Sequence, residues 1–261
     1  ASEQIHQLVA KQYQLFNESI LPELAQQGIR FLRRTSWNDL QRDWIKAYFF
    51  HELMPMLTPI GLDPSHPFPR VLNKSLNFIV ELEGKDAFGR NSGIAIVQAP
   101  RILPRIIRLP SDVSTEEYSF IFLSSILHAH VGELFSGMQA IGCFQFRATR
   151  NSDLFVDEEE IKNLRIALQG ELPQRHLGDA VRLEVADSCP QHMISFLLDQ
   201  LGLTQDDLYQ VSGPVNLVRL MRVPDQIDRP QLKFPLFIPG LPISSRKKKN
   251  NDIFHQIRKN D

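Results

Sequence analysis

Two histidines in the segment LHAH, His128 and His130, are of the residue type that most often binds metals or exchanges protons near neutral pH. The surrounding pattern predicts a helix, and residues two apart on a helix point about 200° away from each other. The two rings therefore cannot share one metal ion or one substrate atom. We expect one ring to be exposed and the other to pack against its neighbours or cap the helix.

Five arginines can bind phosphate oxygens, because the planar guanidinium presents a fork of donors that matches an anionic oxygen pair. Three occur in the segment RILPRIIRLP and two lie near a predicted turn in the middle of the chain; they are Arg101, Arg105, Arg108, Arg147 and Arg150. The simpler explanation is that they solvate the edge of a sheet or pair with nearby acids. The sequence leaves open whether they contact a polyanion.

Other candidates have simpler explanations. The acidic run DEEE at residues 157–160 can bind a metal ion, but it also suits the positive end of a helix. Asp63 and His66 have the chemistry of an acid–base pair, yet they lie in a proline-rich loop where such pairs are usually incidental. The chain contains no glycine-rich phosphate loop and no GxGxxG motif. Taken by themselves, the residues indicate no active site.

The stretch that must position the central arginines is GCFQFRATRNSDLFVDEEEI, residues 142–161. Its first part alternates, with Cys143, Gln145 and Arg147 on one side and Phe144 and Phe146 on the other. This period of two predicts a strand with a buried face. The polar residues that follow predict a turn, and Asp157 is expected to cap a helix.

The remaining pattern mixes strands and helices without strict alternation. Strands are expected over residues 29–32, 76–83, 94–98, 120–123, 140–147, 181–186 and 208–211. Helices are expected over residues 1–27, about 36–54, 125–135, 157–172 and 190–201. This predicts an α+β fold, with a mixed, mostly antiparallel sheet, packed helices and a helical arm at the start.

Punctuating residues refine these expectations. Pro22 should kink the first helix or mark a break, and Gly28 should end it in a left-handed conformation. Thr35 or Ser36 should cap the second helix, and Ser36 with Asp39 resembles a capping box. By the same reasoning, Ser124 or Ser125 should cap the third helix, and Ser188 the last. Four prolines exclude a regular element from residues 58–70, and residues 223–242 should run extended over the surface or bridge to another domain.

Composition places the chain among ordinary globular proteins. It has 261 residues, of which 43% are hydrophobic and 23% charged, with a net charge of -1. That charge gives no general attraction to nucleic acid or to an anionic membrane. Cys143 and Cys189 make no disulfide framework, which favours a reducing compartment such as the cytoplasm, and no apolar run reaches the roughly 18 residues of a spanning helix. Both ends interrupt a helical pattern, so we expect a piece of a longer protein.

Five stretches, in order along nearly the whole chain, carry a resemblance to a known family. They are LTPIGLDPSHPFPRVLNKSLNFIVELEG from Leu57, FIFLSSILHAHVGELFSGM from Phe120, FRATRNSDLFVDEEE from Phe146, GDAVRLEVADSCP from Gly178 and RPQLKFPLFIPGLP from Arg229. Together they resemble bacterial polyphosphate kinase, which extends inorganic polyphosphate from ATP. The long first and third stretches are the most specific.

The resemblance implies a domain plan. Residues 1–28 would be the last helix of a helical N-terminal domain, and residues 29–243 the head, or middle, domain. Residues 244–261 would be the linker and the start of the first catalytic domain. The family's head domain has an α+β fold similar to that of phosphohistidine phosphatases, which agrees with the pattern above.

The resemblance also implies what this chain lacks. The family transfers phosphate through a phosphohistidine in a catalytic domain, and Mg²⁺ and most contacts to ATP also belong to the catalytic domains. None of those motifs matches a position here, so no catalytic, cofactor-binding or metal-binding residue is assigned, and His128 and His130 are not the phosphohistidine. The fragment alone is expected to be inactive.

Two roles remain for the fragment itself. It can be an assembly module that forms a homodimer through the head and the N-terminal helix and meets the missing catalytic domains. Alternatively it can guide the polyphosphate chain through Arg101, Arg105, Arg108, Arg147 and Arg150. Neither nucleic acid nor a membrane span is expected, and peripheral association of a cytoplasmic protein with the membrane stays open.

Overall fold

The computed structural model describes residues 2–62, 68–85, 93–114, 116–151, 178–235 and 237. The chain forms two compact units, Ala1–Arg222 and Val223–Asp261. The first unit holds all the strands found in the described residues and both of their hydrophobic cores.

A six-stranded sheet forms the centre of the first unit, in the order β2-β4-β3-β7-β8-β9. Its strands are β2 (Thr58–Gly61), β3 (Leu76–Gly84), β4 (Ile94–Ala99), β7 (Met138–Arg150), β8 (Ala180–Ala186) and β9 (Leu208–Val211). All neighbours run antiparallel except β8 and β9, which are parallel. The predicted α+β fold with a mixed, mostly antiparallel sheet is therefore confirmed.

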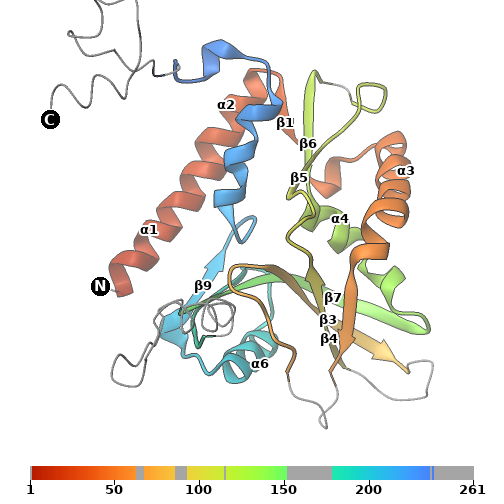
Figure 1. Cartoon of the computed structure of the whole chain (residues 1–261), viewed down its shortest axis with the longest axis vertical. Helices are drawn as coiled ribbons and strands as arrows, with labels where there is room; N and C mark the ends of the chain where they lie inside the picture. Colours follow the sequence, from red (N-terminus) through yellow and green to blue (C-terminus); the bar gives the residue numbers. More distant parts are fainter. Residues whose placement is uncertain are drawn as a thin grey trace, which may run out of the picture. The chain divides into compact units, whose positions relative to one another are not determined.

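Each face of this sheet carries its own core, because side chains alternate between the faces of a strand. On β3, Phe78 and Val80 belong to one core and Ile79 to the other. On β7, Cys143 and Phe146 separate in the same way, as the alternation predicted. Figure 1 shows α6 (Gln191–Leu201) against one face, and α3 (Asp39–Tyr48) and α4 (Leu123–His130) on the opposite side.

A second, three-stranded sheet has the order β1-β6-β5. It consists of β1 (Ile29–Phe31), β5 (Ile106–Arg108) and β6 (Tyr118–Phe122), with β1 parallel and β5 antiparallel to β6. The sequence pattern missed β5. Its three residues are too short for a period, and it forms only because β6 offers it a free edge.

The N-terminal helix runs through α1 (Ser2–Leu15), a π-helical turn (Phe16–Ile20) and α2 (Leu21–Gln26). Pro22 lacks an N–H and would clash with the carbonyl four residues earlier, and the widened turn just before it provides the room. The predicted disturbance at Pro22 is thus a π turn within a continuous helix. Gly28 ends the helix at φ 74°, as predicted.

Polar contacts hold the N-terminal helix against β9 and the segment after it. The Tyr13 hydroxyl donates to the Pro214 carbonyl at 2.6 Å, and the Asn17 amide donates to the Ser212 carbonyl at 2.7 Å. The His6 ring stacks on Tyr209 with centroids 4.1 Å apart. These contacts fix which side of the helix faces the protein, and they leave apolar residues on the other side exposed, among them Leu8 at 66%.

Three predicted caps are wrong. Asn38, not Thr35 or Ser36, begins α3 through a reciprocal capping box with Gln41, because the chain around residues 34–36 forms a separate 3₁₀ turn. Neither Ser124 nor Ser125 caps α4, which starts directly from β6 at Phe122. Pro190 rather than Ser188 occupies the N-cap position of α6.

The exclusion of regular structure from residues 58–70 is also wrong. β2 pairs with β4, placing Pro59 opposite Val97. Proline is tolerated there because β2 is an edge strand, whose outward side needs no donor.

The second unit contains two short 3₁₀ turns, Pro224–Gln226 and Pro230–Leu232, so the extended run expected from residue 223 is wrong at these positions. Each turn begins at a proline, whose fixed φ suits the first position of a helical turn. No helix in the described part of the chain is long and apolar enough to cross a membrane. The helix expected over residues 157–172 and the linker 244–261 lie outside the described residues. The domain boundaries at residues 28 and 243 stay predictions.

Candidate functional site: a cationic cavity

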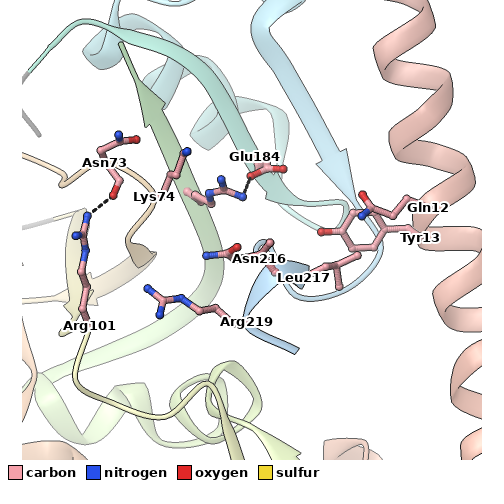
Figure 2. Close-up of a pocket in the computed structure, with 11 residues that line it drawn as sticks. Gln12, Tyr13, Asn73, Lys74, Arg101, Glu184, Asn216, Leu217 and Arg219 are labelled. Atoms are coloured by element: carbon pink, nitrogen blue, oxygen red, sulfur yellow. Dashed lines mark hydrogen bonds and ion pairs between the residues drawn. The ribbon is translucent and has the colours of Figure 1, made fainter. Parts of the chain in front are cut away.

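A cavity of about 450 Å³ opens in the first unit (Figure 2). Its walls come from α1, the turn before β3, the turn after β4, the strands β7 and β8, and a 3₁₀ segment (Leu217–Arg222) that follows β9. The lining residues are Gln12, Tyr13, Asn73, Lys74, Arg101, Arg147, Glu184, Asn216, Leu217, Val218 and Arg219. Segments far apart in sequence therefore bring four cations and one carboxylate to one opening.

Lys74 is placed by a tight turn, in which the Ser75 N–H donates to the Leu72 carbonyl at 3.2 Å. The Lys74 N–H donates to the Ala148 carbonyl of β7 at 2.8 Å. Lys74 takes φ 57°, the left-handed region, which costs an L-residue about 1–2 kcal/mol relative to ordinary helical backbone. Glycine would adopt this backbone conformation more easily. A lysine at this position therefore lowers the stability of the fold relative to glycine.

Arg101 is oriented by the same turn. One of its terminal nitrogens donates to the Asn73 carbonyl, and Figure 2 shows this bond at the edge of the cavity. The Asn73 side chain accepts in turn from the Arg150 N–H at 2.9 Å, which fixes the turn to β7. A guanidinium carries five N–H donors, so Arg101 retains others for a ligand.

Arg147 and Glu184 form the back wall, on neighbouring strands in direct register. Glu184 is 6% exposed and pairs with Arg147 at 2.7 Å and with Arg182 at 2.8 Å. The Arg182 guanidinium also lies 3.8 Å from the centre of the Tyr209 ring, on which His6 of α1 stacks. The one carboxylate in the described lining thus pairs with two arginines. Through Arg182, Tyr209 and His6, these contacts extend to the N-terminal helix.

Lys74 and Arg219 enter no ion pair within the described residues. Figure 2 shows both side chains, with the Asn216 amide, around the same opening. Tyr13 closes the opposite side, and burial, with a smaller contribution from Glu184, raises the pKa of its hydroxyl, so it stays a donor. The cavity therefore combines excess positive charge with neutral hydrogen-bonding groups.

The structure divides the five arginines expected to contact a polyanion. Arg101 and Arg147 line the cavity, whereas Arg105 is half-buried and outside its lining, close enough to Arg101 and Arg219 for their charges to help lower its pKa. Arg150 donates to the Val71 and Gly178 carbonyls at 2.8 and 3.0 Å. Its guanidinium therefore connects two loops. Arg108 lies over the Tyr118 ring at 4.6 Å on the small sheet and does not line the cavity. Their contact with polyphosphate stays a prediction.

Sequence reasoning missed Lys74 and Arg219. The first has a local signal, since the polar residues Asn73, Lys74 and Ser75 interrupt two apolar runs, and asparagine favours a turn. Arg219, in the segment LVRLMR, has none: only the return of the chain after β9 brings it opposite Lys74.

The two histidines behave as their helical spacing predicts. The His130 ring packs on Phe49 with centroids 5.2 Å apart, and His128 remains partly exposed and contacts the Arg34 guanidinium through Nδ1. Partial burial and the adjacent Arg34 lower the pKa of His128. Neither histidine lines the cationic cavity, and His128 and Cys143 border a separate pocket of about 210 Å³.

The remaining candidates acquire no site. Burial raises the pKa of the Cys143 thiol to about 12, so it is not a thiolate at neutral pH. The described residues contain no group of three or more His, Cys, Asp or Glu side chains that could hold a metal ion. Asp63, His66 and the acidic run 157–160 lie outside the described residues. The cavity can therefore bind and orient anions, while its described lining offers no nucleophile with an adjacent base.

Comparisons with known proteins agree with this architecture. Residues 40–223 match the family model described as the polyphosphate kinase middle domain. The chain is 63% identical over 239 residues to a polyphosphate kinase of Neisseria meningitidis serogroup B, which covers 92% of this chain and 35% of that protein. It is 54% identical over 260 residues to a polyphosphate kinase of Pseudomonas aeruginosa, covering 100% and 37%.

A solved structure shares the fold. The crystal structure of polyphosphate kinase from Porphyromonas gingivalis superposes with a TM-score of 0.72 at 20% identity, over 95% of this chain and 35% of that one. The chain spans little more than a third of the length of the curated relatives it matches.

Proposed function

Because the chain belongs to the polyphosphate kinase family, we propose that it is the middle module of an enzyme that transfers the terminal phosphate of ATP to inorganic polyphosphate. In this proposal the phosphohistidine and the sites for ATP and Mg²⁺ belong to other domains, as the resemblance implies. The module alone is then inactive, and its contribution is to position the product chain and the assembly.

The observation that carries a role in polyphosphate contact is the convergence of Lys74, Arg101 and Arg219 on one cavity. A polyphosphate chain is a flexible polyanion with one charge or more on each phosphoryl group, and cations that share an opening can bind successive groups. Glu184 opposes this attraction little, because two arginines already pair with its carboxylate. Hydrogen bonds to charged groups contribute about 1.5–3 kcal/mol each when they replace water.

Binding of long-chain polyphosphate tests this role. We expect Lys74→Gln and Arg219→Gln each to weaken binding by roughly tenfold, the effect of about 1.4 kcal/mol. Because binding releases counterions, affinity should fall steeply with salt, and each lost cation should reduce the slope of log K against log salt by roughly 0.7–0.9.

Arg42→Gln is the matched control. Arg42 is a partly exposed arginine outside the cavity, paired with Asp39 at 2.9 Å, and its loss should leave both affinity and slope unchanged. Equal affinities for the cavity variants and this control would place polyphosphate elsewhere.

A second role, self-association, is supported by the arm. Four apolar side chains of the N-terminal helix are 41–66% exposed; they are Ile5, Leu8, Leu15 and Ile20. Covering a Leu side chain contributes about 1.5–3 kcal/mol, and a two-fold pair of identical chains is the commonest way to cover a repeated surface. We infer that the arm takes part in a homodimer, alongside contacts with the catalytic domains of the same enzyme.

Light scattering over a dilution series tests the homodimer. Leu8→Glu with Leu15→Glu should give monomers at concentrations where the unmodified chain is dimeric. A monomeric mass for the unmodified chain at high micromolar concentration, or an unchanged dimer in the double variant, would exclude the arm as the interface. We place the protein in the cytoplasm, a proposal supported by its two free, buried cysteines.

A further inference from the structure

A second pocket, of about 210 Å³, opens where the central sheet divides. The pairing of β7 with β8 ends at Phe146 and Val185, and beyond this pair the two chains separate. Residues 143–145 of β7 line the pocket, and so do residues 186–188, which leave the end of β8. No residue of this lining also lines the cationic cavity, so the two hollows are separate.

Arg34 brings a positive charge to this pocket. It begins the 3₁₀ turn Arg34–Ser36, and its guanidinium contacts the Nδ1 atom of His128, which lines the same pocket. Partial burial and the charge of Arg34 lower the pKa of His128, so the ring is neutral at neutral pH and accepts from the guanidinium. Arg34 pairs with no carboxylate in the described part of the chain, and a guanidinium has five N–H donors, so it retains donors for an anionic group.

The start of α4 adds donors to the lining. Ser124 and Ser125 lie in its first turn, and both line the pocket. No side chain caps this helix, and the N–H groups of a first turn have no acceptor within the helix. With the two hydroxyls and the guanidinium of Arg34, they suit the oxygens of a carboxylate.

Asp187 brings the opposite charge to the same pocket. It directly follows β8, and its N–H donates to the Val211 carbonyl at 3.1 Å, which fixes its backbone. Asp187 and Arg34 form no ion pair with each other. A simple anion would be repelled by Asp187 and a simple cation by Arg34, so a ligand that carries both charges fits this pocket best.

The remaining lining selects for size and for an apolar group. It includes the side chains of Phe78, Phe144 and Val211, which can cover apolar surface of a ligand. The volume is below the roughly 300–1,000 Å³ of pockets that hold drug-sized ligands, which favours a small metabolite. An α-amino acid joins a carboxylate, an ammonium group and a side chain at one carbon atom, and therefore offers all three features in a small volume.

We propose that the pocket between Arg34 and Asp187 binds a small zwitterion, an α-amino acid with an apolar side chain. Arg34 and the start of α4 bind its carboxylate, Asp187 accepts from its ammonium group, and the apolar lining covers its side chain. The bound ligand connects the turn after β1, helix α4 and the end of β8. This site does not depend on the contact with polyphosphate.

Equilibrium dialysis of the 261-residue chain against labelled L-valine, L-leucine and L-methionine tests the proposal. We expect saturable binding of at least one of them at one site per chain. Two analogues of that amino acid separate the charges: the N-acetyl derivative lacks the ammonium group, and the amide lacks the carboxylate. Each should bind roughly tenfold more weakly or worse, because hydrogen bonds between charged groups are among the stronger ones.

Variants of the two charged residues locate the site. Arg34→Gln and Asp187→Asn should each weaken binding by roughly tenfold or more. Both side chains are exposed, so the variants should fold, which circular dichroism verifies. Arg30→Gln and Asp206→Asn are the matched controls, since both residues are exposed and outside the pocket, and both variants should bind as the unmodified chain does.

Three outcomes would overturn the proposal. If none of the three amino acids bound at millimolar concentration, the pocket would not be an amino-acid site. If Asp187→Asn bound the N-acetyl derivative or inorganic phosphate more tightly than the unmodified chain binds the amino acid, the pocket would be a site for simple anions. Unchanged affinity in both Arg34→Gln and Asp187→Asn would place the amino acid elsewhere on the protein.

Discussion

Replacing Glu184 by glutamine should have opposite effects on folding and on anion binding. The substitution keeps the shape of the side chain and removes the one carboxylate of the cavity. Arg147 and Arg182 would lose the charge with which they pair at 2.7 and 2.8 Å. Because Arg147 would no longer be paired with a carboxylate and could contact the ligand instead, the cavity should bind polyphosphate more tightly.

The loss of stability follows from the burial of the pair. At an effective dielectric constant of 20, unit charges about 4 Å apart attract by about 4 kcal/mol, and desolvation offsets much of this. Removing one partner of a buried ion pair nevertheless costs about 3–5 kcal/mol, because the remaining charge stays buried. Glutamine can still accept hydrogen bonds, so we expect the free energy of unfolding to fall by about 2–4 kcal/mol.

Urea unfolding followed by circular dichroism measures this directly. Glu116→Gln is the matched control: Glu116 pairs with Arg30 at 3.3 Å, and both side chains are substantially exposed, at 31% and 51%. An exposed pair contributes about 0–1 kcal/mol. The reasoning would be refuted if the two variants were destabilised equally, or if Glu184→Gln bound polyphosphate more weakly while remaining folded.

Three further predictions concern single residues. Lys74→Gly should raise the free energy of unfolding by up to about 1 kcal/mol, since glycine takes the left-handed conformation freely, yet weaken polyphosphate binding; urea unfolding and a binding titration separate the two effects. Because the pKa of His128 is lowered in the fold, the unfolded chain binds more protons, so stability should fall as pH drops below about 6.5, and His128→Gln should reduce that slope in unfolding measured from pH 7.5 to 5.5. Cys143, whose pKa burial raises to about 12, should not react with a thiol reagent at pH 8 until urea unfolds the chain, and rapid reaction in the native state would contradict its burial.

The sheet was the most predictable part of the fold. On β3 and β7, alternation assigned the faces correctly because a strand buried on both sides must still send successive side chains to opposite cores. The caps failed for a different reason. Ser124 and Ser188 are good capping residues, but the strand leading into α4 and the proline leading into α6 had already fixed where those helices begin.

The candidate site was predictable only in part. Arg101 and Arg147 stood out by residue type, and both line the cavity, whereas Arg150 and Arg108 proved to hold the fold or stack on a ring. Nothing in the local sequence distinguishes these arginines, since Arg147 and Arg150 lie on the same strand, and Arg101 and Arg108 lie in one ten-residue segment, RILPRIIRLP.

The sequence by itself determined the α+β class, the family and the positions of most strands, because these depend on local periodicity and on long stretches of characteristic residues. Only the tertiary structure decided which cations meet. Lys74, Arg101, Arg147 and Arg219 are separated by up to 145 positions and come together because β3 and β8 both pair with β7 and the chain returns across them after β9. A cavity is a property of the space between elements, and its charge depends on pairings, such as that of Glu184 with two arginines, which no spacing along the chain records.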